Sequence, residues 1–165
     1  MSIFHRSKPD IDAAYFTYGD LLYRVAFAQL ANDADAQDAV QDTFVKYMTK
    51  APHFTDENHE KAWLIRVTMN RCRDIARRNK LHSHHPLSEI SHVESEEKQG
   101  YHEWLRQIHG LPDIYRSILI LHCLEGFSLQ ESADSLGISL SAAKMRLRRG
   151  RDILEQIRQE EKHVF

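Results

Sequence analysis

The sequence predicts an all-α protein with two small helical domains joined by a flexible linker. Apolar residues recur at helical spacing both before residue 81 and after residue 100. Between these segments the composition shifts to histidine, serine and glutamate with few aliphatic residues, as in a linker. A length of 165 residues fits one domain or two small ones, and a hydrophobic content of 42% can fill their cores.

The charge distribution indicates several binding surfaces rather than one general attraction to nucleic acid. The net charge is only −2, but acidic and basic blocks alternate along the chain. The first ten residues lack the apolar segment of a signal peptide, and no stretch approaches the length of a membrane span. Cys72 and Cys123 show no metal-ligand spacing. We therefore expect a cytoplasmic protein in which both cysteines are reduced, buried thiols.

The first two helices are expected over residues 10–31 and 34–49, with Asp33 or Asp35 capping the second. The buried set of the second helix is expected to be Ala36, Ala39, Val40, Phe44, Tyr47 and Met48. Its opposite face is acidic and carries Asp35, Asp38, Gln41 and Asp42. Carboxylates in a first turn complement the helix dipole, but Asp42 lies too far into the helix for that role. This face is suited to a basic partner.

A polar loop at residues 51–60 precedes a third helix, expected over residues 61–80. A single acid, Asp74, opposes the cations of this helix, which are Lys61, Arg66, Arg71, Arg73, Arg77, Arg78 and Lys80. Phe54 in the loop and Trp63 at the helix start lie beside this basic block. Cations next to aromatic rings suit unstacked single-stranded bases. Trp63 taken alone fits a buried core residue better.

The linker at residues 81–100 contains four histidines, which are His82, His84, His85 and His92. A flexible tract lacks the fixed surroundings that orient metal ligands, so no metal site is expected there. A short helix over residues 101–109 should then pack on the helix that follows.

The stretch 111–154 predicts three helices separated by two sharp breaks. Pro112 suits the first turn of the first helix, because its missing N–H group is not needed there. Gly126 ends that helix. Ser128 and Glu131 then form a capping box, which begins a short second helix.

Gly137 can adopt the left-handed conformation of a tight turn, and Ser139 can cap the third helix, so the pattern is that of a helix-turn-helix. The third helix carries five cations with no acid among them, which are Lys144, Arg146, Arg148, Arg149 and Arg151. Lys144, Arg148 and Arg151 are spaced i, i+4 and i+7, so they share an outward face, and Met145 and Arg149 lie beside it. Such a face predicts docking in a DNA major groove.

Four blocks of the chain together resemble the extracytoplasmic-function (ECF) sigma factors, the minimal two-domain group of the sigma-70 family. They are D-A-Q-D-A-V-Q-D-T-F at 35–44, W-L-x-R-V-x-x-N-R-C-R-D-I-A-R-R at 63–78, the charged linker, and L-P-x-x-Y-R followed by the helix-turn-helix. The resemblance implies sigma region 2 at residues 1–80, a linker at 81–100 and sigma region 4 at 101–165. Region 2 would bind polymerase and the −10 promoter element, and region 4 the −35 element.

The resemblance also implies roles for individual residues. The segment that docks on the clamp helices of the polymerase β′ subunit matches Asp38, Gln41, Asp42 and Phe44. Residues 54–60 match a loop that captures a flipped base of the −10 element. The family's −10 surface as a whole matches Phe54, Trp63, Arg66, Asn70, Arg71, Arg73, Arg77 and Arg78. The −35 surface matches Lys144, Met145, Arg148 and Arg149 for base edges and phosphates, with Arg146 and Arg151 for phosphates. The linker would thread through polymerase toward its RNA exit path, and the polymerase partners would be the β′ clamp helices and the β subunit.

The implied function is promoter recognition and transcription initiation by binding, without cofactors, under the control of an anti-sigma factor. Two departures from the family pattern leave the −35 sequence open. Ser132 stands where the family has an aliphatic residue, and Ala142-Ala143 stands where it has threonine-valine.

The sequence also leaves two alternative functions to compare with this one. A ligand-responsive helix-turn-helix regulator would use the N-terminal helices as a sensory domain, and it predicts an apolar ligand pocket and self-dimerisation. That alternative leaves the acidic helix and the second basic block unexplained. The sequence contains no glycine-rich phosphate loop, nucleophile motif or acid pair in a recognisable frame, so we expect that the protein is not an enzyme.

Overall fold

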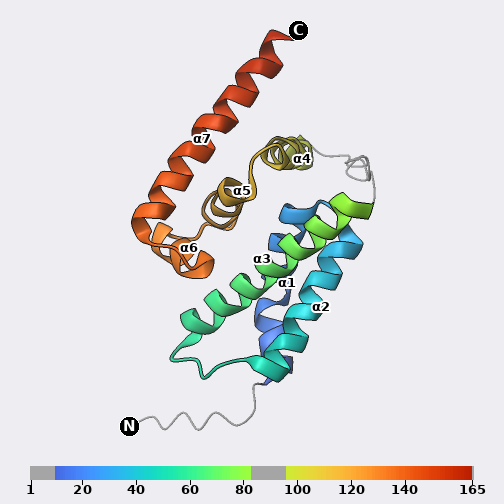
Figure 1. Cartoon of the computed structure of the whole chain (residues 1–165), viewed down its shortest axis with the longest axis vertical. Helices are drawn as coiled ribbons and strands as arrows, with labels where there is room; N and C mark the ends of the chain where they lie inside the picture. Colours follow the sequence, from blue (N-terminus) through green and yellow to red (C-terminus); the bar gives the residue numbers. More distant parts are fainter. Residues whose placement is uncertain (1–9, 83–95, 165) are drawn as a thin grey trace.

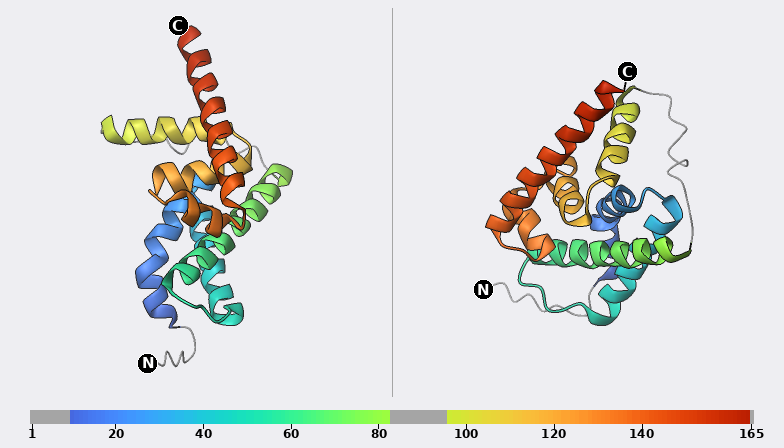
Figure 2. Two further views of the ribbon diagram at one scale, coloured as in Figure 1. Left: turned by 90° about the vertical axis from the view of Figure 1, so that its left-hand side faces the viewer. Right: turned by 45° about the horizontal axis from the view of Figure 1, so that its top comes forward.

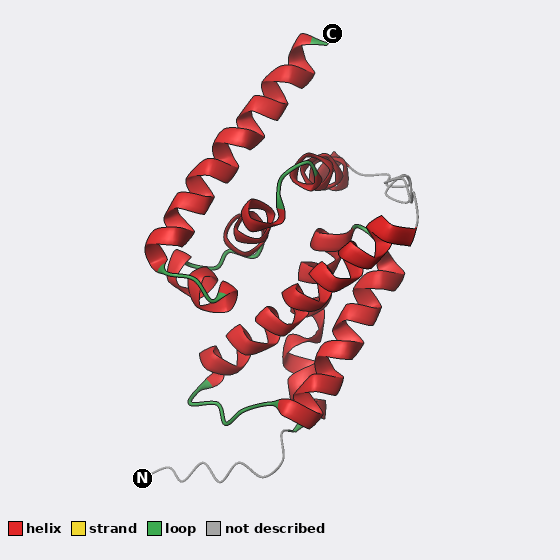
Figure 3. Cartoon of the chain, viewed as in Figure 1, coloured by secondary structure: helices red, strands yellow, loops and turns green. Residues whose placement is uncertain are grey.

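The computed structural model describes residues 10–82 and 96–164, and every regular element in these ranges is helical (Figure 3). The elements are α1 (Ile11–Leu30), α2 (Asp33–Lys50), α3 (Glu57–His82), α4 (Glu96–His109), α5 (Asp113–Leu119), the π-helical turn η2 (Ile120–Leu124), α6 (Leu129–Leu136) and α7 (Leu140–His163). The predicted all-α class is therefore confirmed. None of the helices in this described part is long and apolar enough to cross a membrane.

The start of α2 differs from the expectation. Asn32, rather than Asp33 or Asp35, is the N-cap, and its side-chain oxygen accepts from the backbone N–H of Asp35 at 2.9 Å. Ala31 closes α1 in the left-handed conformation at φ 51°, so the next residue is the one with the extended backbone that an N-cap needs. Asp33 instead accepts a hydrogen bond from the hydroxyl of Tyr23.

The third helix is longer than expected and the linker is shorter. α3 begins at Glu57 because Asp56 caps it, with its carboxylate accepting from the N–H of His59 at 2.8 Å. It continues to His82, and α4 begins at Glu96, inside the expected linker. The remaining linker residues, with His84, His85 and His92, lie outside the described residues.

Helices α1, α2 and α3 pack on one another as the N-terminal unit (Figure 1). Its core is aliphatic and aromatic and includes Leu22, Val25, Ala26, Ala36, Ala39, Phe44, Tyr47, Leu64, Ile65 and Met69. Burial of each large side chain contributes roughly 1.5–3 kcal/mol. Inside this core the hydroxyls of Thr43 and Thr68 pair at 3.0 Å, so neither buried polar group is left without a partner.

Helices α4 to α7 form the C-terminal unit, and its helix-turn-helix is built as predicted. Ser128 and Glu131 make both hydrogen bonds of the capping box, and Gly137 has a φ of 67°. The Ser139 side chain accepts from the N–H of Ala142 at 3.1 Å. The helix after Pro112 is not uniform, because it passes from α5 into the π-helical turn η2.

The serine that departs from the family pattern fits its buried position. Ser132 is fully buried, and its hydroxyl donates to the carbonyl of Ser128 at 2.9 Å. A satisfied hydroxyl can stand where an aliphatic side chain is usual without the penalty of an unpaired buried group. The second departure is Ala142-Ala143, and its Ala143 faces inward and is also fully buried.

The two units lie against one another, which the sequence did not predict (Figure 2). α3 packs on α6, and the carboxyl end of α1 lies against the C-terminal unit. Gln29 bridges the units at their centre: its side-chain amide donates to the hydroxyl of Ser117 at 2.9 Å and lies 3.1 Å from the sulfur of Met69. In the described ranges, one continuous cluster of buried apolar side chains includes residues of both units, such as Leu22 and Ile118.

Candidate nucleic-acid and polymerase surfaces

The front of α7 presents its cations to solvent. Ala143, Leu147, Gly150 and Leu154 face inward, and a Cβ on Gly150 would lie 3.4 Å from Tyr115 and Leu119, so α7 packs closely on α5. The exposed residues of the opposite side are Lys144, Met145, Arg148, Arg149 and Arg151, while Arg146 is half-buried. We refer to Lys144, Arg148, Arg149 and Arg151 as the α7 stripe. The helix has no acid in its first turn, so its dipole adds to the positive field.

The cations of α3 divide into two groups. Arg77 and Arg78 are exposed, and Arg77 has only a long contact of 3.7 Å with Asp74. Other predicted DNA contacts are already engaged: Arg71 with Asp42 at 2.5 Å, Arg73 with Asp113 at 2.6 Å and with Asn70 at 2.9 Å, and Arg66 with the carbonyl of Asp134. These groups are partly exposed, so each ion pair is worth only about 0–1 kcal/mol.

The aromatic residues of the −10 surface pack together instead of projecting into solvent. Phe54 lies 5.7 Å from Trp63 and 6.2 Å from Tyr47 between ring centroids, and all but the buried Tyr47 are half-buried. Phe54 is therefore only partly accessible to DNA, because the loop folds back onto the start of α3. Trp63 occupies the edge of the core, as its hydrophobicity suggested.

The acidic face of α2 is only partly accessible. Asp38 and Gln41 are exposed, and Asp42 is half-buried in its pair with Arg71. Phe44 is 4% exposed and packs on Tyr15, so it supports this face from within the core and does not add to its surface. The matched docking segment includes it because the family motif spans both sides of the helix.

Two apolar residues extend the acidic face. Val45 and Met48 are 52% and 53% exposed on α2. The prediction that Met48 is buried was wrong, because it lies in the last turn of α2, beyond the core position of Tyr47. The helical positions of Asp38, Gln41 and Val45 share one side, which was the available signal.

The cysteines also differ from expectation. Cys72 is buried, and this burial raises the pKa of its thiol to about 12, so it is unreactive. Cys123 is exposed, which corrects the prediction that both thiols are buried. Within the described ranges no cluster of three or more His, Cys, Asp or Glu side chains is placed to hold a metal ion.

Two family descriptions match separate parts of the chain: Sigma-70 region 2 matches residues 15–82, and Sigma-70, region 4 matches residues 101–154. The RNA polymerase sigma factor SigZ of Bacillus subtilis is 33% identical over 126 residues, covering 73% of this chain and 70% of that protein. The chain belongs to the sigma-70 family. It is an ECF-type sigma factor.

Further relatives agree with this sigma factor's assignment. The ECF RNA polymerase sigma factor SigE of Mycolicibacterium smegmatis is 28% identical over 158 residues. The match covers 90% of this chain but only 61% of the length of that relative. The fold resembles CnrH in complex with the cytosolic domain of CnrY, with a TM-score of 0.66, 22% identity, and coverage of 91% and 88% of the two chains. It also resembles RpoE bound to the anti-sigma factor NepR from Bartonella quintana, with a TM-score of 0.65, 21% identity, and coverage of 91% and 97%.

The contact between the two units of this sigma factor uses charged groups at several points. The guanidinium of Arg24 pairs with Glu125 at 3.1 Å, and the ammonium of Lys61 lies 4.2 Å from the ring centre of Phe127. His109 donates from Nε2 to the carbonyl of Ala28 at 3.0 Å. Burial and the nearby Arg116 lower the pKa of His109 to about 4, against the smaller opposing effect of the Ala28 hydrogen bond.

The buried His109 makes the stability of this sigma factor depend on pH. Its ordinary pKa of 6.5 exceeds its folded value of about 4, so the unfolded state binds the proton first and stability falls as pH drops between these values. The slope from this one group is at most about 1.4 kcal/mol per pH unit. In urea unfolding at pH 7.5, 5.5 and 4.5, the free energy of unfolding should fall less with decreasing pH in His109→Gln than in the unmodified chain. An equal fall of the free energy of unfolding in both proteins would contradict the assignment of this pH dependence to His109.

Proposed function

We propose that this sigma factor directs RNA polymerase to promoters with two separate DNA-binding surfaces. The observation that carries the proposal is the α7 stripe, four exposed cations at the front of the second helix of a helix-turn-helix. Phosphates supply affinity to such a surface, and arginine can bind guanine edges through two hydrogen bonds. In this proposal residues 101–165 read the −35 element, with Met145 and Arg146 beside the stripe.

The second surface is the basic side of α3, within residues 1–80, facing the −10 element. Arg77 and Arg78 would contact phosphates, and Asn70, Phe54 and Trp63 would border the pocket for an unstacked base. Trapping such a base offsets a cost of a few kcal/mol for removing it from the stack. The mechanism is binding rather than catalysis, and the protein would act in the cytoplasm.

Promoter binding would require the two units to separate. Arg66 and Arg73, two of the predicted −10 contacts, are held by Asp134 and Asp113 of the C-terminal unit. While these contacts persist, the two guanidinium groups are only partly available to DNA phosphates. The Arg73–Asp113 ion pair between the units is partly exposed and individually weak, so exchange of this carboxylate for a DNA phosphate is energetically feasible.

The partners follow from the surfaces and from the relatives. The acidic face with Asp38 and Gln41 would dock on the β′ clamp helices, and the β subunit would be a further part of the polymerase contact. The solved complex of RpoE with the anti-sigma factor NepR supports an anti-sigma factor as a further partner. Near-neutral overall charge suits a protein that binds DNA strongly only with polymerase.

A binding titration with core RNA polymerase tests the proposal against a ligand-responsive regulator. We expect a stable one-to-one complex of purified chain and core enzyme, because the acidic face provides a dedicated docking surface. The regulator alternative requires no such complex. Absence of binding after removal of any inhibitor would contradict the proposed function.

A further inference from the structure

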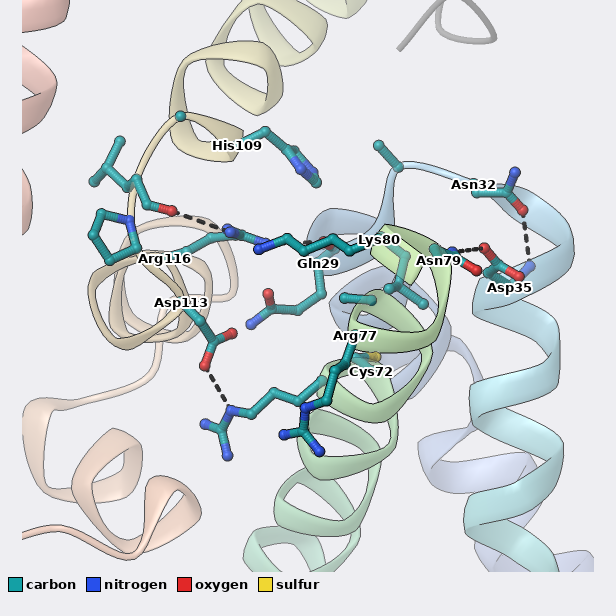
Figure 4. Close-up of a pocket in the computed structure, with 17 residues that line it drawn as sticks. Gln29, Asn32, Asp35, Cys72, Arg77, Asn79, Lys80, His109, Asp113 and Arg116 are labelled. Carbon is teal, nitrogen blue, oxygen red and sulfur yellow. Dashed lines mark hydrogen bonds and ion pairs between the residues drawn. The ribbon is translucent and has the colours of Figure 1, made fainter. Parts of the chain in front are cut away.

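A cavity of about 810 Å³ lies between the two units (Figure 4). It is bordered by the end of α1, the last turns of α3 and the junction of α4 with α5. Its apolar lining includes Leu30, Ala31, Ala76 and Leu111, and His109 borders it on the side of the C-terminal unit. A volume of this size is in the range of about 300–1,000 Å³ that is typical of small-molecule sites.

The polar lining of the cavity is cationic. Its two acids are already engaged: Asp35 accepts from the amide of Asn79 at 2.9 Å, and Asp113 accepts from Arg73 at 2.6 Å. Lys80 and Arg77 enter the lining from α3, so the cations outnumber the acids available to them.

Arg116 is a half-buried member of this group on the C-terminal unit. Its two terminal nitrogens donate to the carbonyls of Gln29 at 3.3 Å and Leu111 at 3.0 Å. Its Nε is buried and has no hydrogen-bond partner. In the close-up the Lys80 side chain extends from α3 toward Arg116 (Figure 4). Burial lowers the pKa of Arg116, and the field of Asp113 only partly opposes this effect. An anion between Lys80 and Arg116 would offset the cost of burying the Arg116 charge.

We propose that this cavity binds a phosphorylated small molecule of nucleotide size. Phosphate oxygens would accept from Lys80 and Arg77 and from the guanidinium edge of Arg116 that lines the cavity, because converging cations suit a group with several negative charges. The apolar lining and the imidazole of His109 would hold the rest of the ligand. The site lies between two packed units, so a DNA duplex has no access to it while they are closed.

A ligand here would fasten the two units together. Lys80 and Arg77 belong to the N-terminal unit and Arg116 belongs to the C-terminal unit, so one phosphate group would bridge them. Ligand binding would then favour the closed arrangement by mass action. Binding of the ligand is a property of the isolated chain and is independent of the proposed activity with polymerase.

The test is calorimetric titration of the full chain with ATP and with pyrophosphate, both without divalent cations. We expect saturable one-to-one binding of ATP and weaker binding of pyrophosphate, with ATP also raising the midpoint of thermal unfolding. Lys80→Glu should weaken ATP binding at least tenfold. Lys50→Glu, which changes an exposed lysine at the end of α2, is the matched control and should bind as the unmodified chain does.

Three results would overturn the proposal. One is the absence of saturable binding by either probe at millimolar concentration, and another is equal affinity of Lys80→Glu and Lys50→Glu for ATP. The third is loss of short-duplex binding in Lys80→Glu with no nucleotide binding by the unmodified chain, which would assign these cations to DNA instead.

Discussion

Arg148→Ala is expected to lower affinity for a promoter −35 element by about 1–3 kcal/mol if the guanidinium binds a base edge with two hydrogen bonds. Arg148 is exposed in the α7 stripe, so its truncation removes a contact without opening a cavity. The fold should therefore be unaffected. The measurement is a binding titration of holoenzyme on promoter fragments, with Arg149→Ala measured beside it.

The matched control is Lys162→Ala, an exposed cation in the last turn of the same helix. It should leave promoter affinity unchanged, because it lies more than three turns from Arg148. A second comparison uses DNA with a scrambled −35 element. Equal losses on the natural and scrambled sequences would show that Arg148 contacts only phosphate and would contradict base recognition.

Asp38→Arg is expected to weaken binding of core polymerase by about tenfold, because it places a cation against a basic partner surface. Asp38 is exposed and is a cleaner target than Asp42, whose carboxylate pairs with Arg71. Loss of one carboxylate near the start of α2 should cost the fold less than about 1 kcal/mol. Affinity is measured by titrating labelled core enzyme.

Glu160→Arg makes the same charge change at an exposed site near the end of α7. It should leave core affinity within a factor of two of the unmodified protein, at the salt concentration where Asp38→Arg is defective. If both variants lose affinity equally, the effect is one of net charge, and α2 is not the docking surface.

Local chemistry made much of the fold predictable. The capping box of Ser128 and Glu131 and the left-handed Gly137 fix the helix-turn-helix through contacts within a few residues, so the sequence contains the whole signal. The exposed face of α7 followed from helical spacing alone. The cap at Asn32 was missed because several neighbouring residues can cap a helix equally well.

The contact between the units was not predictable from local patterns. Arg24 and Glu125 are 101 positions apart, and either could pair with solvent or with another chain. The same limit affected α3, where the arginines were read as a free DNA surface although Arg66 and Arg73 bind groups of the C-terminal unit. A family motif also does not separate surface residues from core residues. Phe44 belongs to the docking motif but is buried in the core.

Run-off transcription tests the central claim most directly. The purified chain is added to core RNA polymerase on templates that carry a promoter selected from a randomised library, with the −10 or the −35 element scrambled in parallel. We expect initiation from the intact promoter and its loss when either element is scrambled, because α3 and α7 would bind the two elements separately. Failure to initiate from any library member, with inhibitors removed, would contradict this claim.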